Sequence, residues 1–319
     1  MVGTDIVAAE VHLPAVPEAE LDFAADYARS EKAAATRRAY QSDFEIFSAW
    51  CAERGLSTLP AKSESVAAFL AGEAKRGTKA STIGRRVAAI RYAHKLAGHP
   101  LPTDDERVRA TVRGIRRTIG AAPVKKQPAL AERIVHMAQT GDGLIAIRDR
   151  ALLLLGFAMA ARRSELSALE LADITDDPAG LLITIRGGKT DQERKGATVA
   201  VVRGEVACPV LALKAWLAVA GITEGPVFRP INRHRQVGSA ALSGISIGQI
   251  VQRHAERIGL DPKAYGGHSL RAGFVTSAAK RGANVFKLME HARHKSMNTT
   301  KGYVRDAELF KDHAGAGLL

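Results

Sequence analysis

The chain has 319 residues, of which 46% are hydrophobic and two are cysteine. This length favours two domains. No apolar run approaches the roughly 20 residues of a membrane span, and the two distant cysteines exclude a disulfide framework. The formal net charge of +13 indicates a polyanionic partner, with nucleic acid as the leading candidate and a merely solvated basic surface as the alternative.

The first half of the chain has apolar residues at helical spacing. Residues 1–28 hold six acids and no Lys or Arg, whereas a secretory signal begins with basic residues. Residues 29–127 hold twenty Lys and Arg against nine acids. The pattern predicts helices over Pro17–Ala28, Ala34–Arg54, Ser63–Arg76, Lys79–Ala97 and Thr103–Ile119. Ser63 and Thr103 are expected N-caps. The sequence therefore predicts an all-helical N-terminal domain over residues 17–120, with a basic face for phosphate.

The second half mixes helices and strands. Residues 121–128 contain two prolines and two lysines and are predicted to be a linker. In the domain expected over 129–319, β-branched residues at Leu181–Arg186 and Ala197–Val202 predict two strands paired as a hairpin. The predicted helices are Ala129–Gln139, Leu144–Leu171, Pro209–Ala220, Ser246–Ile258, His268–Arg281, Val285–His291 and Met297–Phe310. The expected fold class is mainly α with a small β-sheet, an all-helical domain followed by a mixed α+β domain.

Two basic residues in this half are candidates for a functional role. Arg162 and Glu165 are three apart after an apolar segment, so on a helix the carboxylate can orient the guanidinium, although a surface ion pair gives the same spacing. Lys189 lies in a Gly-Gly-Lys-Thr segment after a predicted strand. A P-loop is excluded because the glycine that it requires five residues before the second Gly is Ile183. Lys189 is instead expected at a hairpin tip, where it reaches a phosphate, donates a proton or is simply solvated.

Two further groups follow towards the C-terminus. His268 and Arg271 are three apart, so on a helix they point from one face towards a common spot. This spacing is found in ordinary surface pairs, and also in sites where Arg binds phosphate oxygens and His exchanges a proton. His291 and His294 suggest a metal site, but no carboxylate or cysteine completes a ligand set, so no metal is expected. Tyr303, taken alone, is typical of a packing aromatic.

Together, the four groups resemble the tyrosine recombinase (phage integrase) family, in its simple two-domain Cre- and Xer-like type. The family's first box, Arg-x-Ser-Glu-Leu, matches 162–166, and its second, His-x-Leu-Arg, matches 268–271. Its His-x8-Tyr spacing matches His294 and Tyr303, and its strand-borne lysine matches Lys189. The N-terminal half agrees with the core-binding domain of that family mainly in size and position.

The resemblance implies a DNA strand transfer without metal, ATP or another cofactor. Tyr303 would attack the scissile phosphate and form a 3′-phosphotyrosyl bond, releasing a 5′-hydroxyl. Arg162 and Arg271 would bind the non-bridging oxygens, and Lys189 would protonate the leaving 5′-oxygen.

The resemblance also assigns three supporting roles. His268 would assist proton transfer from the tyrosine, His294 would hydrogen-bond the phosphate, and Glu165 would support the site from its helix.

Two residues depart from the family pattern. Arg293 stands where a glycine commonly precedes the histidine, which is unfavourable if the turn needs a positive φ. Ala160 and Ala161 replace the common Gly-Leu type of approach to the first arginine. Neither departure is expected to touch a catalytic atom.

The partners implied are double-stranded DNA sites and three further copies of the chain. A homotetramer on two duplexes would exchange C-terminal segments, here Arg305–Leu319, and no membrane is involved. The protein would be cytoplasmic and associated with the nucleoid when bound to DNA. Two alternatives remain: a type IB-like topoisomerase, which the box spacing disfavours, and a catalytically inert DNA-binding regulator, which the filled catalytic positions disfavour.

Overall fold

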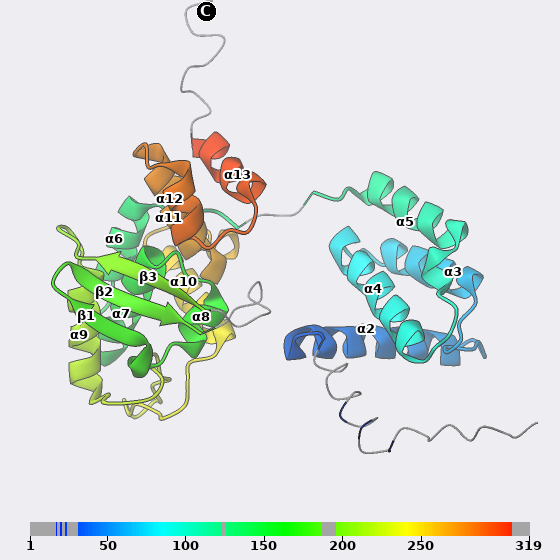
Figure 1. Ribbon diagram of the computed structural model, residues 1–319, viewed down its shortest axis with the longest axis horizontal. Helices are drawn as coiled ribbons and strands as arrows, with labels where there is room; N and C mark the ends of the chain where they lie inside the picture. Colours follow the sequence, from blue (N-terminus) through cyan, green and yellow to red (C-terminus); the bar gives the residue numbers. More distant parts are fainter. Residues whose placement is uncertain are drawn as a thin grey trace, which may run out of the picture. The chain divides into compact units, whose positions relative to one another are not determined.

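The computed structural model describes Pro17, Glu20 and Phe23 together with residues 31–122, 126–186 and 196–307, the side chains of 305–307 excepted. The chain divides into two compact units, 1–124 and 125–319. The first is helical throughout its described part, and the second combines helices with a small sheet that has one exposed face (Figure 1). In the described ranges no helix combines the length and apolarity needed to cross a membrane.

The first unit confirms four of the predicted helices. Its elements are α2 (Ala34–Ala52), α3 (Ser63–Lys75), α4 (Ala80–Leu96), the 3-10 turn η1 (Pro102–Asp104) and α5 (Glu106–Ile119). The expected helix Pro17–Ala28 lies mostly outside the described residues. Both predicted N-caps are wrong: Ser63 is already the first residue of α3, and Thr103 is buried in η1. Asp105 caps α5, because its carboxylate accepts a hydrogen bond from the Arg107 N–H at 2.9 Å.

The first unit has its own hydrophobic core, to which every α-helix contributes. Its buried members are Phe47, Cys51, Val66, Phe69, Leu70, Ile83, Ile90, Val108 and Ile115. Phe47 of α2 and Phe69 of α3 pack with ring centroids 5.1 Å apart. These side chains hold the four α-helices of the first unit together.

The second unit contains the expected hairpin and one strand more. Its elements are α6 (Ala131–Gln139), α7 (Gly143–Ala158), α8 (Arg163–Ala168), η2 (Leu171–Asp173), β1 (Ile174–Asp177), β2 (Gly180–Ile185), β3 (Ala197–Val202), α9 (Pro209–Ala220), α10 (Gly244–Arg257), η3 (Pro262–Ala264), α11 (Gly267–Lys280), α12 (Val285–His291) and α13 (Met297–Ala307). The antiparallel sheet has the order β1-β2-β3, with Ile183 of β2 opposite Val199 of β3. Strand β1 was not predicted, because Ile-Thr-Asp-Asp carries no β-type alternation.

The predicted helix Leu144–Leu171 is wrong, since the segment forms two helices, α7 and α8. Between them Ala160 takes a left-handed φ of +45° and Arg162 is extended at φ −77°, ψ 148°. The Arg162 N–H donates to the Glu165 carboxylate at 2.8 Å, which starts the new helix. Apolar periodicity cannot reveal this break, because Met159, Ala160 and Ala161 are all fully buried.

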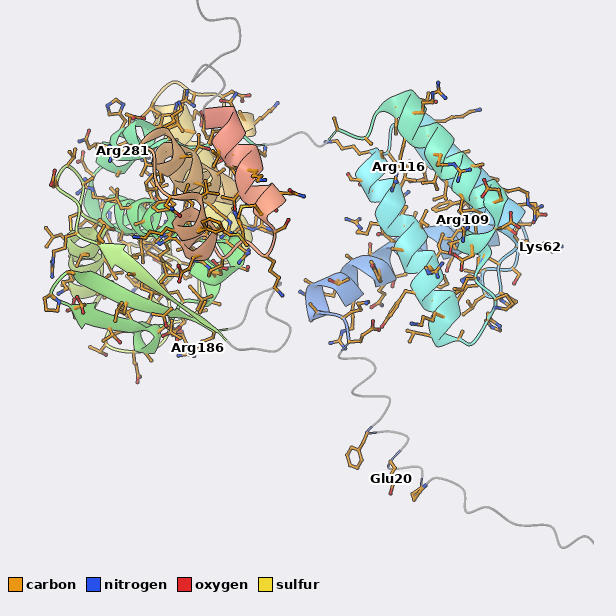
Figure 2. All side chains as sticks on the ribbon, turned by 45° about the horizontal axis from the view of Figure 1, so that its top comes forward. Glu20, Lys62, Arg109, Arg116, Arg186 and Arg281 are labelled. Atoms are coloured by element: carbon orange, nitrogen blue, oxygen red, sulfur yellow. The ribbon has the colours of Figure 1, made fainter. Side chains whose placement is uncertain are left out.

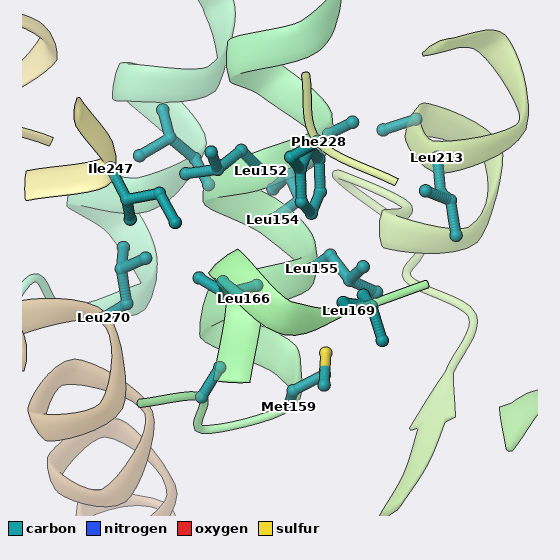
Figure 3. Close-up of a cluster of buried hydrophobic side chains, with 14 of the residues drawn as sticks. Leu152, Leu154, Leu155, Met159, Leu166, Leu169, Leu213, Phe228, Ile247 and Leu270 are labelled. Atoms are coloured by element: carbon teal, nitrogen blue, oxygen red, sulfur yellow. The ribbon is translucent and has the colours of Figure 1, made fainter. Parts of the chain in front are cut away.

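Helix α7 lies at the centre of the core of the second unit and fixes its neighbours. Figure 3 shows its leucines surrounded by Leu166 of α8, Leu213 of α9, Ile247 of α10 and Leu270 of α11. A methyl group on Gly156 of α7 would lie 2.8 Å from carbons of both Leu166 and Leu270. Glycine at this position therefore allows α8 and α11 to approach α7 closely. These two helices carry the first two sequence boxes.

Candidate active site

The described part of the second unit brings five of the six expected catalytic residues into one contact network. Their positions are Arg162 immediately before α8, His268 and Arg271 on α11, His294 between α12 and α13, and Tyr303 on α13. Lys189 lies outside the described residues.

Arg271 is the most deeply buried of these side chains. It is 2% exposed, its Nη1 donates to the Ala160 carbonyl at 2.9 Å, and its Nη2 is buried without a hydrogen-bond partner among the described residues. Burial and the nearby charges of Arg162 and Arg293 lower the pKa of Arg271 to about 10, so the group stays charged at neutral pH. A buried cationic donor of this kind favours an anionic ligand.

Arg162 forms the expected pair with Glu165, although as a residue that precedes the helix. Its Nη1 contacts Glu165 Oε1 at 2.6 Å, and its Nη2 donates to the Arg293 carbonyl at 3.0 Å. Burial acts to raise the pKa of Glu165, but Arg293 and Arg162 outweigh it and hold this pKa below its usual range. Glu165 is therefore an ionised carboxylate that orients Arg162.

Tyr303 lies between two histidines and an apolar cluster. Its hydroxyl is 3.1 Å from His268 Nε2, and its ring stacks on His294 with centroids 5.9 Å apart at 11°. It also packs against the cluster formed by Ala160, Val275 and Ala292. The packing role expected of an isolated tyrosine is thus present, and it holds the hydroxyl beside an imidazole.

Both histidines have depressed basicity. Desolvation and the charges of Arg271 and Arg162 lower the pKa of His268 and bring the pKa of His294 to about 4. His294 Nδ1 lies 2.9 Å from the hydroxyl of fully buried Thr300. At neutral pH both rings are uncharged, so each has one nitrogen that accepts a proton and one that donates.

No functional role was predicted for Thr300, and the prediction for the two departures from the family pattern was wrong. Ala160 and Arg293 both have positive φ, +45° and +53°. The expectation that neither touches a catalytic atom is wrong: the Ala160 carbonyl accepts from Arg271, and the Arg293 carbonyl accepts from Arg162. The acceptors are backbone atoms, which residue types do not reveal.

An open groove of about 690 Å³ adjoins these residues. Arg162, Arg163, Lys126 and His268 supply cationic or ionisable lining, and Gln249 and Gln252 of α10 are among the other lining residues. Such a surface suits an anionic ligand that also offers hydrogen-bonding groups.

His291 contributes to packing. Its Nε2 lies 2.8 Å from the Ala158 carbonyl, and its ring stacks on Phe274 with centroids 4.5 Å apart. Across the described ranges, no group of three His, Cys, Asp or Glu side chains is arranged to hold a metal ion.

Comparison with known proteins identifies relatives of both units. Residues 127–309 match the phage integrase family model, and residues 23–99 match the phage integrase N-terminal SAM-like domain. The chain is 39% identical over 290 residues to an integrase/recombinase xerD homolog of Selenomonas ruminantium, covering 89% of this chain and 85% of that protein. It is 25% identical over 284 residues to recombinase cre of Escherichia phage P1, covering 82% and 81%.

A solved structure has the same fold. A lambda integrase dimer bound to a COC′ core site superposes with a TM-score of 0.61 at 18% identity, over 90% of this chain and 95% of that one. The expected fold class and family are therefore confirmed, and the named relatives favour a recombinase over the topoisomerase and regulator alternatives. The chain belongs to the phage integrase family and is a tyrosine site-specific recombinase.

Proposed function

We propose that this recombinase cuts and rejoins DNA through a 3′-phosphotyrosyl bond to Tyr303. The observation that carries the proposal is the 3.1 Å contact between the Tyr303 hydroxyl and His268 Nε2, beside two arginines. A phenol is a weak nucleophile until a neighbouring base accepts its proton. Because the pKa of His268 is lowered, its neutral ring is available as that base.

The arginines would stabilise the charge of the phosphate during attack. Arg271 has a buried Nη2 with no protein acceptor among the described residues, and Arg162 is fixed by Glu165. Donation from the Thr300 hydroxyl to His294 Nδ1 would place the proton of the neutral His294 ring on Nε2, from which it would donate to a phosphate oxygen. As the bond from phosphorus to Tyr303 forms, the bond to the 5′-oxygen breaks, and Lys189 would protonate that oxygen.

The bound partner would be duplex DNA at a specific site. We assign residues 17–120 to a core-type DNA-binding domain, 121–128 to the linker and 129–319 to the catalytic domain. A DNA partner is supported by the lambda integrase dimer of the same fold, which was solved bound to a COC′ core site. We further propose a homotetramer on two duplexes that exchanges the segment Arg305–Leu319, in a protein that is cytoplasmic and nucleoid-associated when bound. The part of this segment beyond Ala307 lies outside the described residues.

Replacement of Tyr303 by Phe tests the assignment. The variant loses one oxygen and keeps the ring that packs against His294, so it should fold and bind its site but form no covalent adduct on a nicked suicide substrate. Tyr92→Phe, in the first unit, is the matched control and should form the adduct as the wild type does. Absence of an adduct from the wild type on its verified site would favour the regulator interpretation, and an adduct from Tyr303→Phe would identify another nucleophile.

A further inference from the structure

Arg293 reaches from one side of the site to the other. It follows α12 in a left-handed turn, at φ +53°, a conformation that is unfavourable for any residue other than glycine. Its side chain is only 11% exposed and extends to the α7–α8 turn, more than 120 residues earlier in the chain. An arginine held in this way has contacts that offset an unfavourable backbone conformation.

Four acceptors surround the guanidinium. Nη1 donates to the carbonyls of Met159 at 3.1 Å and His291 at 2.8 Å. Nη2 donates to the Ala160 carbonyl at 3.2 Å and to Glu165 Oε2 at 2.7 Å. The planar guanidinium has donors on separate nitrogens and binds all four acceptors at once. A lysine ammonium has only three donors, all on one nitrogen, and cannot do so.

These acceptors are shared with the two arginines of the site. The Ala160 carbonyl also accepts from Arg271, and Glu165 also binds Arg162. The Arg293 backbone completes the connection, because its carbonyl accepts from Arg162 Nη2 at 3.0 Å. Arg293 therefore contacts the acceptor of Arg271 and the carboxylate partner of Arg162, and its own carbonyl is the second acceptor of Arg162.

We propose that Arg293 is a positioning residue that holds Arg162 and Arg271 in the geometry for binding the scissile phosphate. The proposal rests on the function proposed above, in which those two arginines bind that phosphate. The Arg293 guanidinium balances part of the negative charge of the Glu165 carboxylate. Arg162 is then oriented by Glu165 but still has N–H donors for a DNA phosphate. In support, Arg293 is the foremost of the charges that overcome the effect of burial and lower the pKa of Glu165.

Arg293→Gly is the first test. Glycine suits the left-handed turn but removes the guanidinium, so single-turnover cleavage at saturating DNA should fall by up to about 100-fold, the cost of misplacing a reacting group by about 1 Å. The dissociation constant for DNA should stay within about threefold, because Arg293 is largely enclosed by protein. Arg235→Gly is the matched control: Arg235 is an exposed arginine at φ +61°, and its replacement should leave cleavage unchanged.

A double-mutant cycle with Glu165→Gln separates positioning from a general effect on folding. If Arg293 acts partly through the Glu165 charge, its removal costs a smaller factor in the Glu165→Gln background than in the wild type. An equal or larger factor in that background would contradict the proposed connection. If a thermal melt shows that Arg293→Gly is unfolded, Arg293→Lys replaces it in the cycle, because lysine keeps the charge but not the four-acceptor geometry.

The outcomes for Arg293 and for the proposed function are distinguishable. A wild type that forms no adduct on its verified site overturns the proposed function. A wild type that cleaves, together with Arg293→Gly or its Lys replacement cleaving at the wild-type rate, overturns the positioning role alone. A loss of cleavage with unchanged DNA affinity and a smaller factor in the Glu165→Gln background supports it.

Discussion

Arg271 and Arg162 are held by different kinds of acceptor. Arg271 donates Nη1 to a backbone carbonyl, that of Ala160, while Arg162 contacts the ionised Glu165 and the Arg293 carbonyl. A carbonyl fixes direction without neutralising charge, so the full positive charge of Arg271 is kept in a buried place. Of the two, Arg271 is therefore expected to be the more sensitive to substitution.

Arg271→Lys should lower single-turnover cleavage by about 100-fold, the typical loss when one preorganised donor to a developing charge is removed. A lysine that reaches the Ala160 carbonyl has no second planar donor for the phosphate. Affinity for DNA should change by less than about threefold, since many other phosphate contacts contribute. Arg281→Lys, at the exposed end of the same helix α11 (Figure 2), is the control and should cleave normally. Cleavage by Arg271→Lys at the wild-type rate would show that this arginine does not bind the phosphate.

The family resemblance predicted which side chains share the site, and the placement of all of them except Lys189 can be compared with the described structure. The boxes 162–166 and 268–271 and the pair His294 and Tyr303 do converge in the described structure. What they did not predict was the role of Arg293, because its partners include three backbone carbonyls. A carbonyl belongs to every residue, so no sequence pattern marks it.

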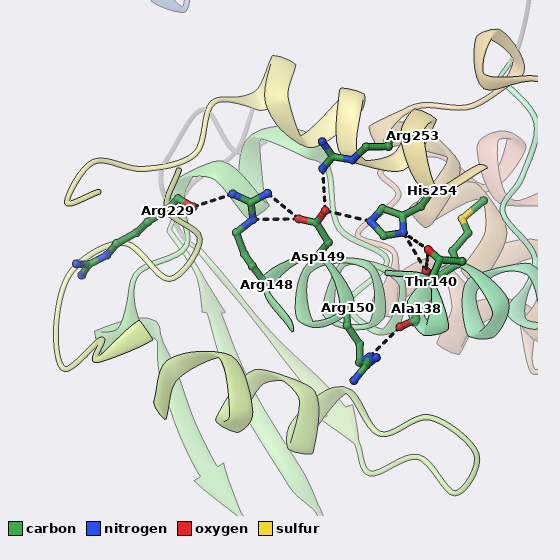
Figure 4. A network of polar contacts seen from close by, with 9 residues as sticks. Ala138, Thr140, Arg148, Asp149, Arg150, Arg229, Arg253 and His254 are labelled. Atoms are coloured by element: carbon green, nitrogen blue, oxygen red, sulfur yellow. Dashed lines mark hydrogen bonds and ion pairs between the residues drawn. The ribbon is translucent and has the colours of Figure 1, made fainter. Parts of the chain in front are cut away.

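At the scale of elements, a buried ionic network joins helices α7 and α10 (Figure 4). Asp149 is fully buried and accepts from Arg148 Nη2 at 2.7 Å, Arg253 Nη2 at 2.8 Å and His254 Nε2 at 3.0 Å. Burial acts to raise the pKa of Asp149, but His254 and Arg148 outweigh it and lower this pKa. The stabilisation that results is fully present above the usual Asp pKa of about 3.9 and is lost as pH falls through the lower folded value.

Asp149→Asn should reduce the free energy of unfolding of the second unit by about 3 kcal/mol, because it leaves buried cationic groups without their carboxylate. Denaturant titration in a Trp50→Phe background reports this unit through Trp216, which is fully buried in its core. The control is Asp176→Asn, whose half-exposed pair with Lys214 contributes at most about 1 kcal/mol. If Asp149→Asn lowers the free energy of unfolding as little as Asp176→Asn does, the network does not stabilise the fold.

Most elements were predictable from periodicity, and the exceptions have a common cause. The break between α7 and α8 falls among fully buried residues, where a continuous apolar pattern hides a change of backbone direction. Strand β1 is short and polar, and it forms because β2 offers an edge to pair with. In both cases tertiary contacts decide the local structure, whereas the hairpin of β2 and β3 follows from its own residues.

For the whole molecule, we expect the net charge of +13 to be the main determinant of DNA affinity. Helix α5 alone carries five arginines, and Figure 2 labels Arg109 and Arg116 along it. Arg107, Arg109 and Arg113 form ion pairs with neighbouring acids, while Arg116 is exposed towards the end of the helix. The basic surface is thus partly neutralised within the first unit.

The logarithm of the DNA binding constant should fall against the logarithm of salt concentration with a slope near −5, if about six phosphates are contacted. Arg116→Gln should make that slope shallower by about 1 if the residue contacts one phosphate. Arg107→Gln should change it less, because Arg107 already pairs with Glu64 and Asp105. A nearly flat titration of the wild type would remove the argument from charge.

The most direct test of the account is to locate the covalent bond to DNA. Wild-type protein is trapped on a nicked suicide substrate and digested, and the peptide that keeps a nucleotide is sequenced by mass spectrometry. We predict a 3′-phosphate on Tyr303, with the other tyrosines, Tyr27, Tyr40, Tyr92 and Tyr265, unmodified. A phosphate on any other residue, or no adduct on the verified target site, would contradict the central claim that Tyr303 is the nucleophile.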